Sequence, residues 1–171
     1  MFEREGRACP VRQGKGNTMA FDELMAETGR KLGVDLVTYD GLTQLMIDDM
    51  EISISEIAER ESVVLSGSLG EPPPQGLAPL YRAMLEANYG FAGTAGATLA
   101  VNPENGELTL TRLAPLALLD AEGFLALLEG FANVLEAWRK LVADYRPNAA
   151  DFAASSLSDG MPQMGGNFLP V

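Results

Sequence analysis

The chain has 171 residues, 47% of them hydrophobic, and its 24 acidic and 12 basic side chains give a formal charge of −12. This length and hydrophobic content suffice for a single domain with a substantial core. The strong negative charge disfavours nucleic acid and anionic membrane surfaces as partners, because both repel an acidic protein.

The sequence lacks the residues that most enzymes need. It has no histidine, the commonest general base and a frequent metal ligand, and Cys9 is its only cysteine. The segment Ser66–Gly70 lacks the first glycine of a nucleophile elbow, and Gly14–Gly16 lacks the rest of a phosphate-binding loop. No long apolar span or signal-peptide core occurs near the start. We therefore expect a cytoplasmic protein that is not an enzyme, binds no cofactor or metal and does not insert into membranes.

The first helix is expected just after a polar leader. Residues 1–18 show no apolar periodicity and predict a disordered leader, with Met19 a candidate for the biological start. Thr18 is suited to cap the helix that follows, and Gly33 to end it. Apolar and small residues then recur at the three-and-four spacing of one helix face. They are Phe21, Leu24, Met25, Thr28 and Leu32.

A change of period from helical to two predicts strands in the next segment. Three short runs there alternate or are rich in β-branched residues, and polar pairs separate them. We predict an antiparallel meander of three strands: Leu42–Ile47, Met50–Ile57 and Ser62–Ser68.

The carboxylates at the first hairpin of this meander allow two interpretations. Asp48 and Asp49, with nearby Glu51, resemble an acid/base or metal cluster when they are considered alone. Acidic residues at a hairpin tip are more commonly solvated turn residues. We adopt the second interpretation, with a carboxylate enzyme as the remote alternative.

The second half of the chain predicts a helix, a hairpin and a longer helix. The proline-rich segment Glu71–Gly76 is a stiff connector. One face of the following helix carries Leu77, Leu80, Tyr81, Met84, Leu85 and Asn88. The turn Asn102–Gly106 joins two strands, 97–101 and 107–113.

The longest helix is expected to begin after Asp120, which can cap it, and to end before Pro147. Its apolar stripe consists of Phe124, Leu127, Leu128, Phe131, Leu135, Trp138, Leu141, Val142 and Tyr145. The folded domain thus spans residues 19–146. Residues 147–171 predict a flexible tail, or alternatively a segment that docks on a groove.

Several blocks of this sequence resemble class I type III secretion chaperones of the Tir chaperone family. They are Leu45–Ile54, Leu80–Asn88, Gly96–Pro103, Leu110–Arg112 and Phe131–Arg139. The likeness covers about residues 19 to 145 and rests on the order and spacing of the blocks. It implies an α+β sandwich with the element order helix, three-stranded meander, helix, hairpin and long C-terminal helix.

The resemblance also implies a homodimer that binds the unfolded N-terminal segment of an exported effector without ATP. It implies dimer contacts through Tyr81, Met84, Leu85 and Leu99. The expected partner-binding residues are Phe21, Leu24, Met25, Leu45, Ile47, Ile52 and Ile54, for which the alternative role is plain core. A regulatory binding module of the anti-activator type, built on the same scaffold, is the alternative function.

Overall fold

Six strands form one antiparallel sheet in the order β1-β2-β3-β4-β6-β5. The computed structural model describes residues 20–146 of the chain. Within that range the elements are α1 Phe21–Leu32, β1 Thr38–Tyr39, β2 Leu42–Ile47, β3 Met50–Ile57, η1 Ala58–Arg60, β4 Ser62–Gly70, α2 Leu77–Asn88, η2 Tyr89–Phe91, β5 Thr98–Val101, β6 Leu108–Pro115, η3 Leu116–Leu118 and α3 Ala121–Asp144.

The predicted fold class and element order are confirmed. The meander is β2-β3-β4, and the hairpin β5-β6 joins it through pairing of β6 with β4. The two-residue strand β1 is an addition that the sequence interpretation did not include. The predicted leader and tail concern residues outside the part of the chain that the structure describes.

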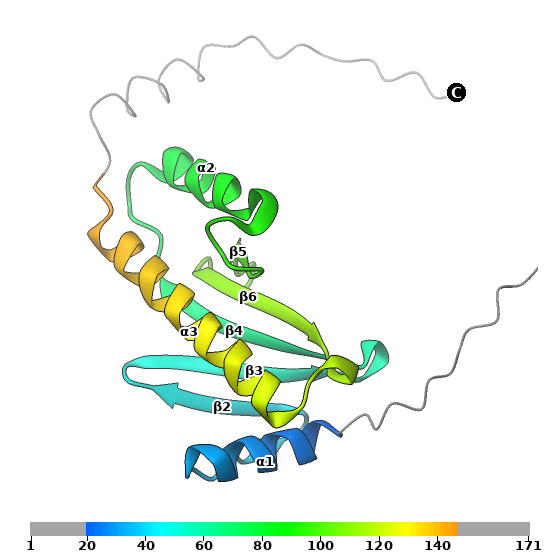
Figure 1. Cartoon of the computed structure of the whole chain (residues 1–171). Coiled ribbons are helices and arrows are strands. Elements are labelled where there is room, and N and C mark those ends of the chain that lie inside the picture. The colour runs from blue at the N-terminus through cyan, green and yellow to red at the C-terminus, as the bar shows by residue number, and fades with distance from the viewer. Residues whose placement is uncertain (1–19, 147–171) are drawn as a thin grey trace, which may run out of the picture.

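The helices occupy different places around the sheet. Figure 1 shows α3 crossing in front of the sheet, α1 on the β2 side and α2 on the β5–β6 side. Helix α3 packs mainly on β4 and also contacts α1, whereas α2 packs on β5. One helix therefore spans the middle of the sheet, and the other two lie toward its opposite edges.

Strand alternation separates a buried face from a polar one. Ile52 and Ile54 on β3 and Leu65 on β4 have no exposed surface, and they belong to the same core as Phe124 and Leu135 of α3. The intervening residues face the other way, as expected for an antiparallel sheet with one wet face. On that face one row of paired residues crosses five strands: Gln44, Ser53, Ser66, Thr111 and Thr98.

The helix ends follow the local sequence. Asp120 accepts a hydrogen bond from the N–H of Gly123 at 2.7 Å and so caps α3, as predicted. Gly33 ends α1 in the left-handed region, with φ of 71° and its N–H bonded to Gly29 O. Thr18, the expected cap of α1, lies outside the described residues, and Ala20 precedes the helix without a side-chain cap.

The close approach of α3 to the sheet requires a glycine on β4. A methyl group at Gly67 would lie 2.5 Å from Leu135 Cδ2 and 2.8 Å from its Cδ1. Leu135 is completely buried, so its side chain has little room to withdraw. Gly67 therefore sets how closely the longest helix lies on the sheet.

Replacing Gly67 with alanine is expected to lower the free energy of unfolding by about 1–3 kcal/mol, because overpacking displaces neighbouring side chains. Thermal denaturation measures this as a fall of about 4 °C per kcal/mol for a domain of this size. Gly130→Ala in α3 is the matched control, since no atom lies within 4 Å of the added methyl group. It is expected to raise the stability by about 0.5–1 kcal/mol. Equal midpoints for Gly67→Ala and the wild type would contradict the close contact.

Candidate functional site

An apolar hollow lies between α2 and β5. Its volume is about 270 Å³ and its lining is almost entirely apolar. The lining residues are Tyr81, Met84, Leu85, Leu99, Ala100 and Val101. All four residues expected at a dimer contact are thus brought together at one place, which we call the α2–β5 surface.

The side chains of the α2–β5 surface differ in their accessibility. Met84 and Leu99 are 4% and 5% exposed and form its floor, whereas Leu85 is 68% exposed. Tyr89 and Phe91 follow directly in η2 and add two more exposed aromatic rings, which the sequence interpretation did not single out. A monomer rarely exposes so many neighbouring apolar groups without a partner for them.

Charged residues flank this surface on α2. Arg82 and Glu86, one helical turn apart, form an exposed ion pair with 2.8 Å between Arg82 Nε and Glu86 Oε1. The hydrogen bond to Glu86, and secondly its charge, raise the pKa of Arg82 above its usual value. The surface therefore has the apolar centre and charged rim that are common at protein interfaces.

Side chains from distant parts of the chain fix the segment that carries the α2–β5 surface. Each donates a hydrogen bond to a backbone carbonyl at the beginning of α2 or in the loop before β5. The bonds are Tyr145 Oη to Gly76 O at 3.1 Å, Trp138 Nε1 to Gly93 O at 2.9 Å and Arg112 Nη1 to Ala95 O at 2.7 Å.

A second candidate surface follows the other edge of the sheet. Strand β1 pairs only with Leu42 and Thr43 of β2, so the rest of β2 has no neighbour on that side among residues 20–146. The two-residue hairpin loop after Ile47 makes Ile47 and Met50 a hydrogen-bonded pair. By alternation, the N–H and C=O groups of Gln44 and Met46 point away from β3. Those of Gln44 lie opposite Val37 at the end of β1, and those of Met46 point to the open edge.

Exposed apolar side chains surround this open edge. They are Leu32, Val34, Val37, Tyr39, Leu42 and Met46, with Tyr39 84% and Met46 62% exposed. We call this set, with the open edge, the β1–β2 surface. A groove of about 680 Å³ adjoins it between α1 and the loop after it, and its lining includes Gly29, Val34 and Val37.

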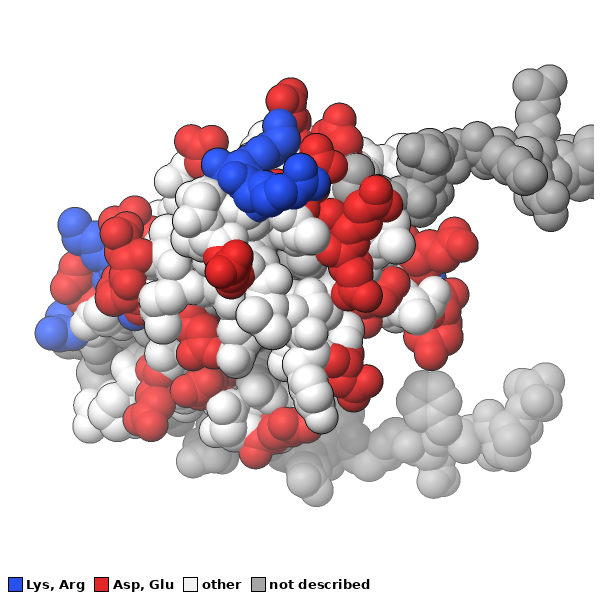
Figure 2. Space-filling view, turned by 90° about the horizontal axis from the view of Figure 1, so that it is seen from below, with Lys and Arg blue, Asp and Glu red and all other residues white. Residues whose placement is uncertain are grey.

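Acidic residues surround the same side of the molecule. Figure 2 looks from below the view of Figure 1, toward the side on which Figure 1 has α1 and β2. Asp and Glu side chains are distributed around an uncharged area in this view, and Lys and Arg are fewer. Such a rim keeps an apolar area soluble without covering it.

The seven predicted partner-binding residues lie beneath this surface. Five of them are at most 2% exposed: Phe21, Leu24, Met25, Ile52 and Ile54. Leu45 and Ile47 of β2 are partly buried against the same core. The structure brings all seven together, but the five buried side chains belong to the hydrophobic core and are not accessible to a partner. The neighbouring accessible groups belong to the β1–β2 surface instead.

A turn signal in the sequence could have predicted strand β1, which is the part of the β1–β2 surface that the sequence prediction did not include. Asp40 and Gly41 have φ angles of 50° and 71°, which a two-residue hairpin turn with left-handed residues requires. An Asp-Gly pair between residues that favour strands is a recognised hairpin signal. It would have placed Val37 and Tyr39 beside β2.

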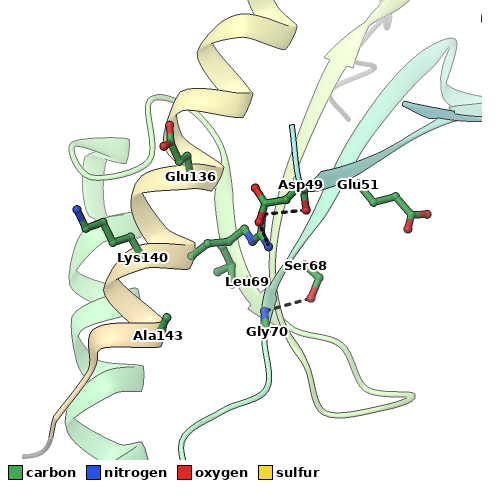
Figure 3. Close-up of a pocket in the computed structure, with 9 residues that line it drawn as sticks. Asp49, Glu51, Ser68, Leu69, Gly70, Glu136, Lys140 and Ala143 are labelled. Carbon is green, nitrogen blue, oxygen red and sulfur yellow. Dashed lines mark hydrogen bonds and ion pairs between the residues drawn. The ribbon is translucent and has the colours of Figure 1, made fainter. Parts of the chain in front are cut away.

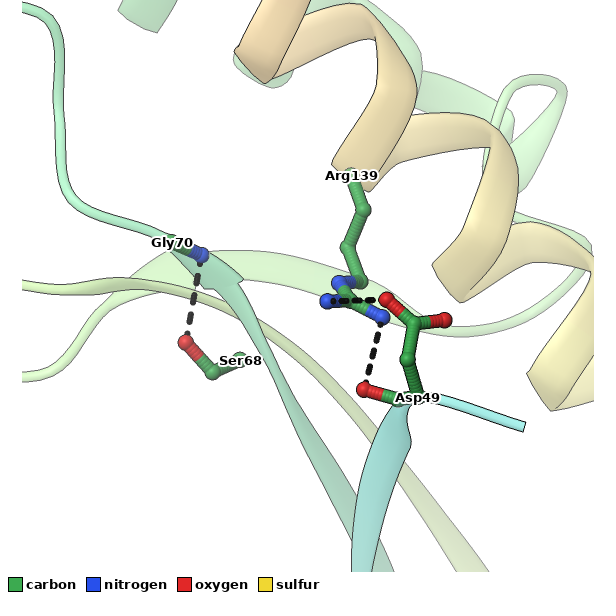
Figure 4. A network of polar contacts seen from close by, with 4 residues as sticks. All are labelled: Asp49, Ser68, Gly70 and Arg139. Carbon is green, nitrogen blue, oxygen red and sulfur yellow. Dashed lines mark hydrogen bonds and ion pairs between the residues drawn. The ribbon is translucent and has the colours of Figure 1, made fainter. Parts of the chain in front are cut away.

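The hairpin tip between β2 and β3 adjoins a polar hollow, not a catalytic cluster. This hollow of about 500 Å³ lies between the tip, the end of β4 and the last turns of α3, and Figure 3 shows Asp49, Glu51, Ser68, Glu136 and Lys140 around it. Arg139 donates to Asp49 O at 3.2 Å and to Asp49 Oδ2 at 3.1 Å (Figure 4).

The contacts of Asp49 agree with a turn residue tied to α3. Its carboxylate already has a cationic partner, and its side chain is 84% exposed. No group of three or more His, Cys, Asp or Glu suited to a metal ion occurs between residues 20 and 146. In the same range, no helix combines the length and apolarity needed to cross a membrane.

A family model matches most of the part of the chain that the structure describes. The family model of the Tir chaperone protein (CesT) family matches residues 23–139, which is more than half of the chain. The chain therefore belongs to the Tir chaperone protein (CesT) family, and the family predicted from the sequence is confirmed. Comparison with curated protein sequences finds no matching relative.

Solved structures share the fold at low sequence identity. The HopA1–SchA chaperone–effector complex contains a chain with a TM-score of 0.62 and 20% identity, covering 72% of this chain and 96% of that one. The ExsC–ExsE complex contains a chain with a TM-score of 0.63 and 21% identity, covering 77% of this chain and 97% of that one. The structure of the Yersinia pestis type III secretion chaperone SycH, in complex with a stable fragment of YscM2, matches with a TM-score of 0.56 and 17% identity. The match covers 70% of this chain and 99% of that one.

Proposed function

We propose that this chain is an ATP-independent secretion chaperone that binds the N-terminal region of a type III secretion effector and keeps it soluble. Membership of the Tir chaperone family supports this function, as do similar folds solved as chaperone complexes. The observation that carries the proposal is the open β2 edge bordered by exposed apolar side chains. Such an edge suits an extended, unfolded segment better than a folded domain.

The open edge supplies two kinds of contact to such a client. Its backbone would add to β2 by hydrogen bonds to Met46 beyond the end of β1, and such bonds do not depend on client sequence. Its side chains would pack against Tyr39, Met46 and the groove beside α1, which favours alternating apolar residues. Leu45 and Ile47 support this contact from the inner face of β2, while the five buried candidates hold the strand in place.

The acidity of the chain has a role in this function. Between residues 20 and 146, exposed apolar groups occur at both edges of the sheet, so uncharged molecules would associate through them. A formal charge of −12 makes molecules repel one another over about 8 Å at physiological ionic strength. The protein can therefore keep apolar surfaces available for its client.

The chemistry proposed is binding alone, in the cytoplasm where an effector awaits export. No covalent step is assigned to the chain. Asp49 is bound to Arg139, and the contact of Ser68 Oγ with Glu107 Oε2 is long, at 3.4 Å, and exposed to solvent. Ordering an unfolded client costs conformational entropy, so many weak contacts along an edge are needed for stable binding.

The α2–β5 surface is proposed as the homodimer contact. It has an apolar hollow, an exposed Leu85 beside it and aromatic rings at its end, and a second copy would offer the same set. Two-fold interfaces are self-complementary in this way. Stable interfaces bury about 1,200–2,000 Å² in total, so η2 and the outer side of α2 would both have to contribute.

Leu85→Glu is expected to convert the dimer into a monomer, because it places a charge at the centre of an apolar contact. Light scattering at micromolar concentration measures the change, and circular dichroism should remain that of the wild type. Leu141→Glu on α3 is the matched control, since Leu141 is also exposed, at 44%, but is not among the residues that line the hollow. A wild-type protein that is monomeric at this concentration would contradict the dimer proposal.

Met46→Pro tests the proposed strand addition at the backbone. Proline removes the N–H that points to the open edge, and edge strands accept proline there because no ladder bond is lost. We expect client co-purification to fall at least about tenfold, equivalent to about 1.4 kcal/mol, with the fold retained. Met46→Ala keeps the N–H and should lose much less. If the two variants bind equally, the client does not pair with β2.

The identity of the co-purifying protein distinguishes the two candidate functions. Affinity purification of the full chain from its native cell, followed by mass spectrometry, identifies the partner directly. Recovery of effector N-terminal regions supports the chaperone, whereas recovery of a transcriptional regulator supports the regulatory module. Addition of ATP should change neither the partner nor its amount.

A further inference from the structure

The opposite edge of the sheet, β5, has its own outward-facing backbone groups. Asn102 N–H donates to Glu107 O at 2.8 Å, so this pair is hydrogen-bonded at the base of the β5–β6 hairpin. By alternation, the N–H and C=O groups of Leu99 and Val101 point away from β6. Without a partner, these groups would form a second open edge.

The side chain of Asn88 occupies part of this edge. Its Nδ2 donates to Leu99 O at 3.1 Å, and its Oδ1 accepts from Leu99 N–H at 2.9 Å. A carboxamide presents one donor and one acceptor side by side, as the backbone of a neighbouring strand does. Asn88 therefore satisfies Leu99 in the way that one residue of an added strand would.

We propose that Asn88 closes the β5 edge and thereby restricts strand addition to the β1–β2 edge. As far as it concerns the client, this inference rests on the proposed function. On β5 the outward backbone groups of Leu99 are bonded to Asn88, whereas β2 continues beyond β1 and leaves the outward groups of Met46 without a neighbouring strand among residues 20–146. A strand adds where backbone groups lack partners, so the β2 edge is the more accessible of the two.

The position of Asn88 suits it to block strand addition at Leu99. It is the last residue of α2, and Leu99 beneath it is only 5% exposed, so water competes little for the two bonds. A strand arriving at Leu99 would have to displace the end of α2 as well as the side chain. The same bonds also place α2 on β5, which positions Leu85 and Tyr81 at the proposed dimer surface.

The inference is tested first by amide hydrogen exchange of the full chain, without any client. In Asn88→Ala the Leu99 N–H loses its acceptor, and we expect its exchange to accelerate at least about tenfold. Asn102→Ala is the matched control, because it removes a side-chain bond to Glu104 N–H in the same hairpin but not at the edge. Exchange at Leu99 should be unchanged in this control.

The second readout is self-association, with the protein itself as the source of strands. An opened β5 edge should pair with that of another molecule, so light scattering should find species larger than the wild type in Asn88→Ala and not in Asn102→Ala. If Asn88→Ala does not fold, Asn88→Asp replaces it, since the carboxylate keeps the acceptor for Leu99 N–H but cannot donate to Leu99 O. It should then leave Leu99 exchange near that of the wild type and form no larger species, because its carboxylate still occupies the edge.

Three results would overturn the inference. Unchanged Leu99 exchange in Asn88→Ala would mean that the two bonds do not protect the edge. Faster exchange without larger species would mean that Asn88 only anchors α2. In Asn88→Asp, larger species that form while Leu99 N–H stays protected would likewise contradict the role given to Asn88. None of these measurements involves an effector, so a wild type that binds no effector would overturn the proposed function alone.

Discussion

The packing of α3 across β4 is the contact on which the other features depend. Leu135 lies directly over Gly67, and later residues of the same segment contact both the α2–β5 region and the β2–β3 hairpin. Trp138 and Tyr145 hold the loop before β5 and the beginning of α2, while Arg139 holds the β2–β3 hairpin tip. A single helix therefore positions the two surfaces that we assign to self-association and to the client.

In the proposed function, the two edges of the sheet have different tasks. At β5 an asparagine replaces a neighbouring strand, and apolar side chains of α2 and η2 remain for a second copy. At β2 the backbone stays open, and the accessible side chains accompany it. Backbone pairing does not depend on the sequence of the added strand, whereas side-chain contacts favour particular residues. An open edge with an apolar border can therefore bind unfolded segments whose sequences differ, provided that they carry some apolar residues.

The sequence predicted the fold class because long periodic segments dominate it. The stripe from Phe124 to Tyr145 and the alternation in β3 are strong local patterns, and the resemblance supplied the family. Periodicity could not say which apolar residues are accessible, since the burial of Phe21 and Ile52 depends on how distant elements assemble into one core. Tyr81, Met84, Leu85 and Leu99 were predicted together, but the bonds from Asn88 join elements eleven residues apart, and no local rule reveals them.

Amide hydrogen exchange of the chain alone and in complex with its co-purified effector tests the central claim most directly. The account predicts that Met46, whose N–H group points to the open edge, exchanges quickly in the free protein and slowly in the complex. Leu99 should be protected in both states. Protection by the effector that leaves β2 unchanged, or that occurs at β5 instead, would contradict strand addition at the β1–β2 surface.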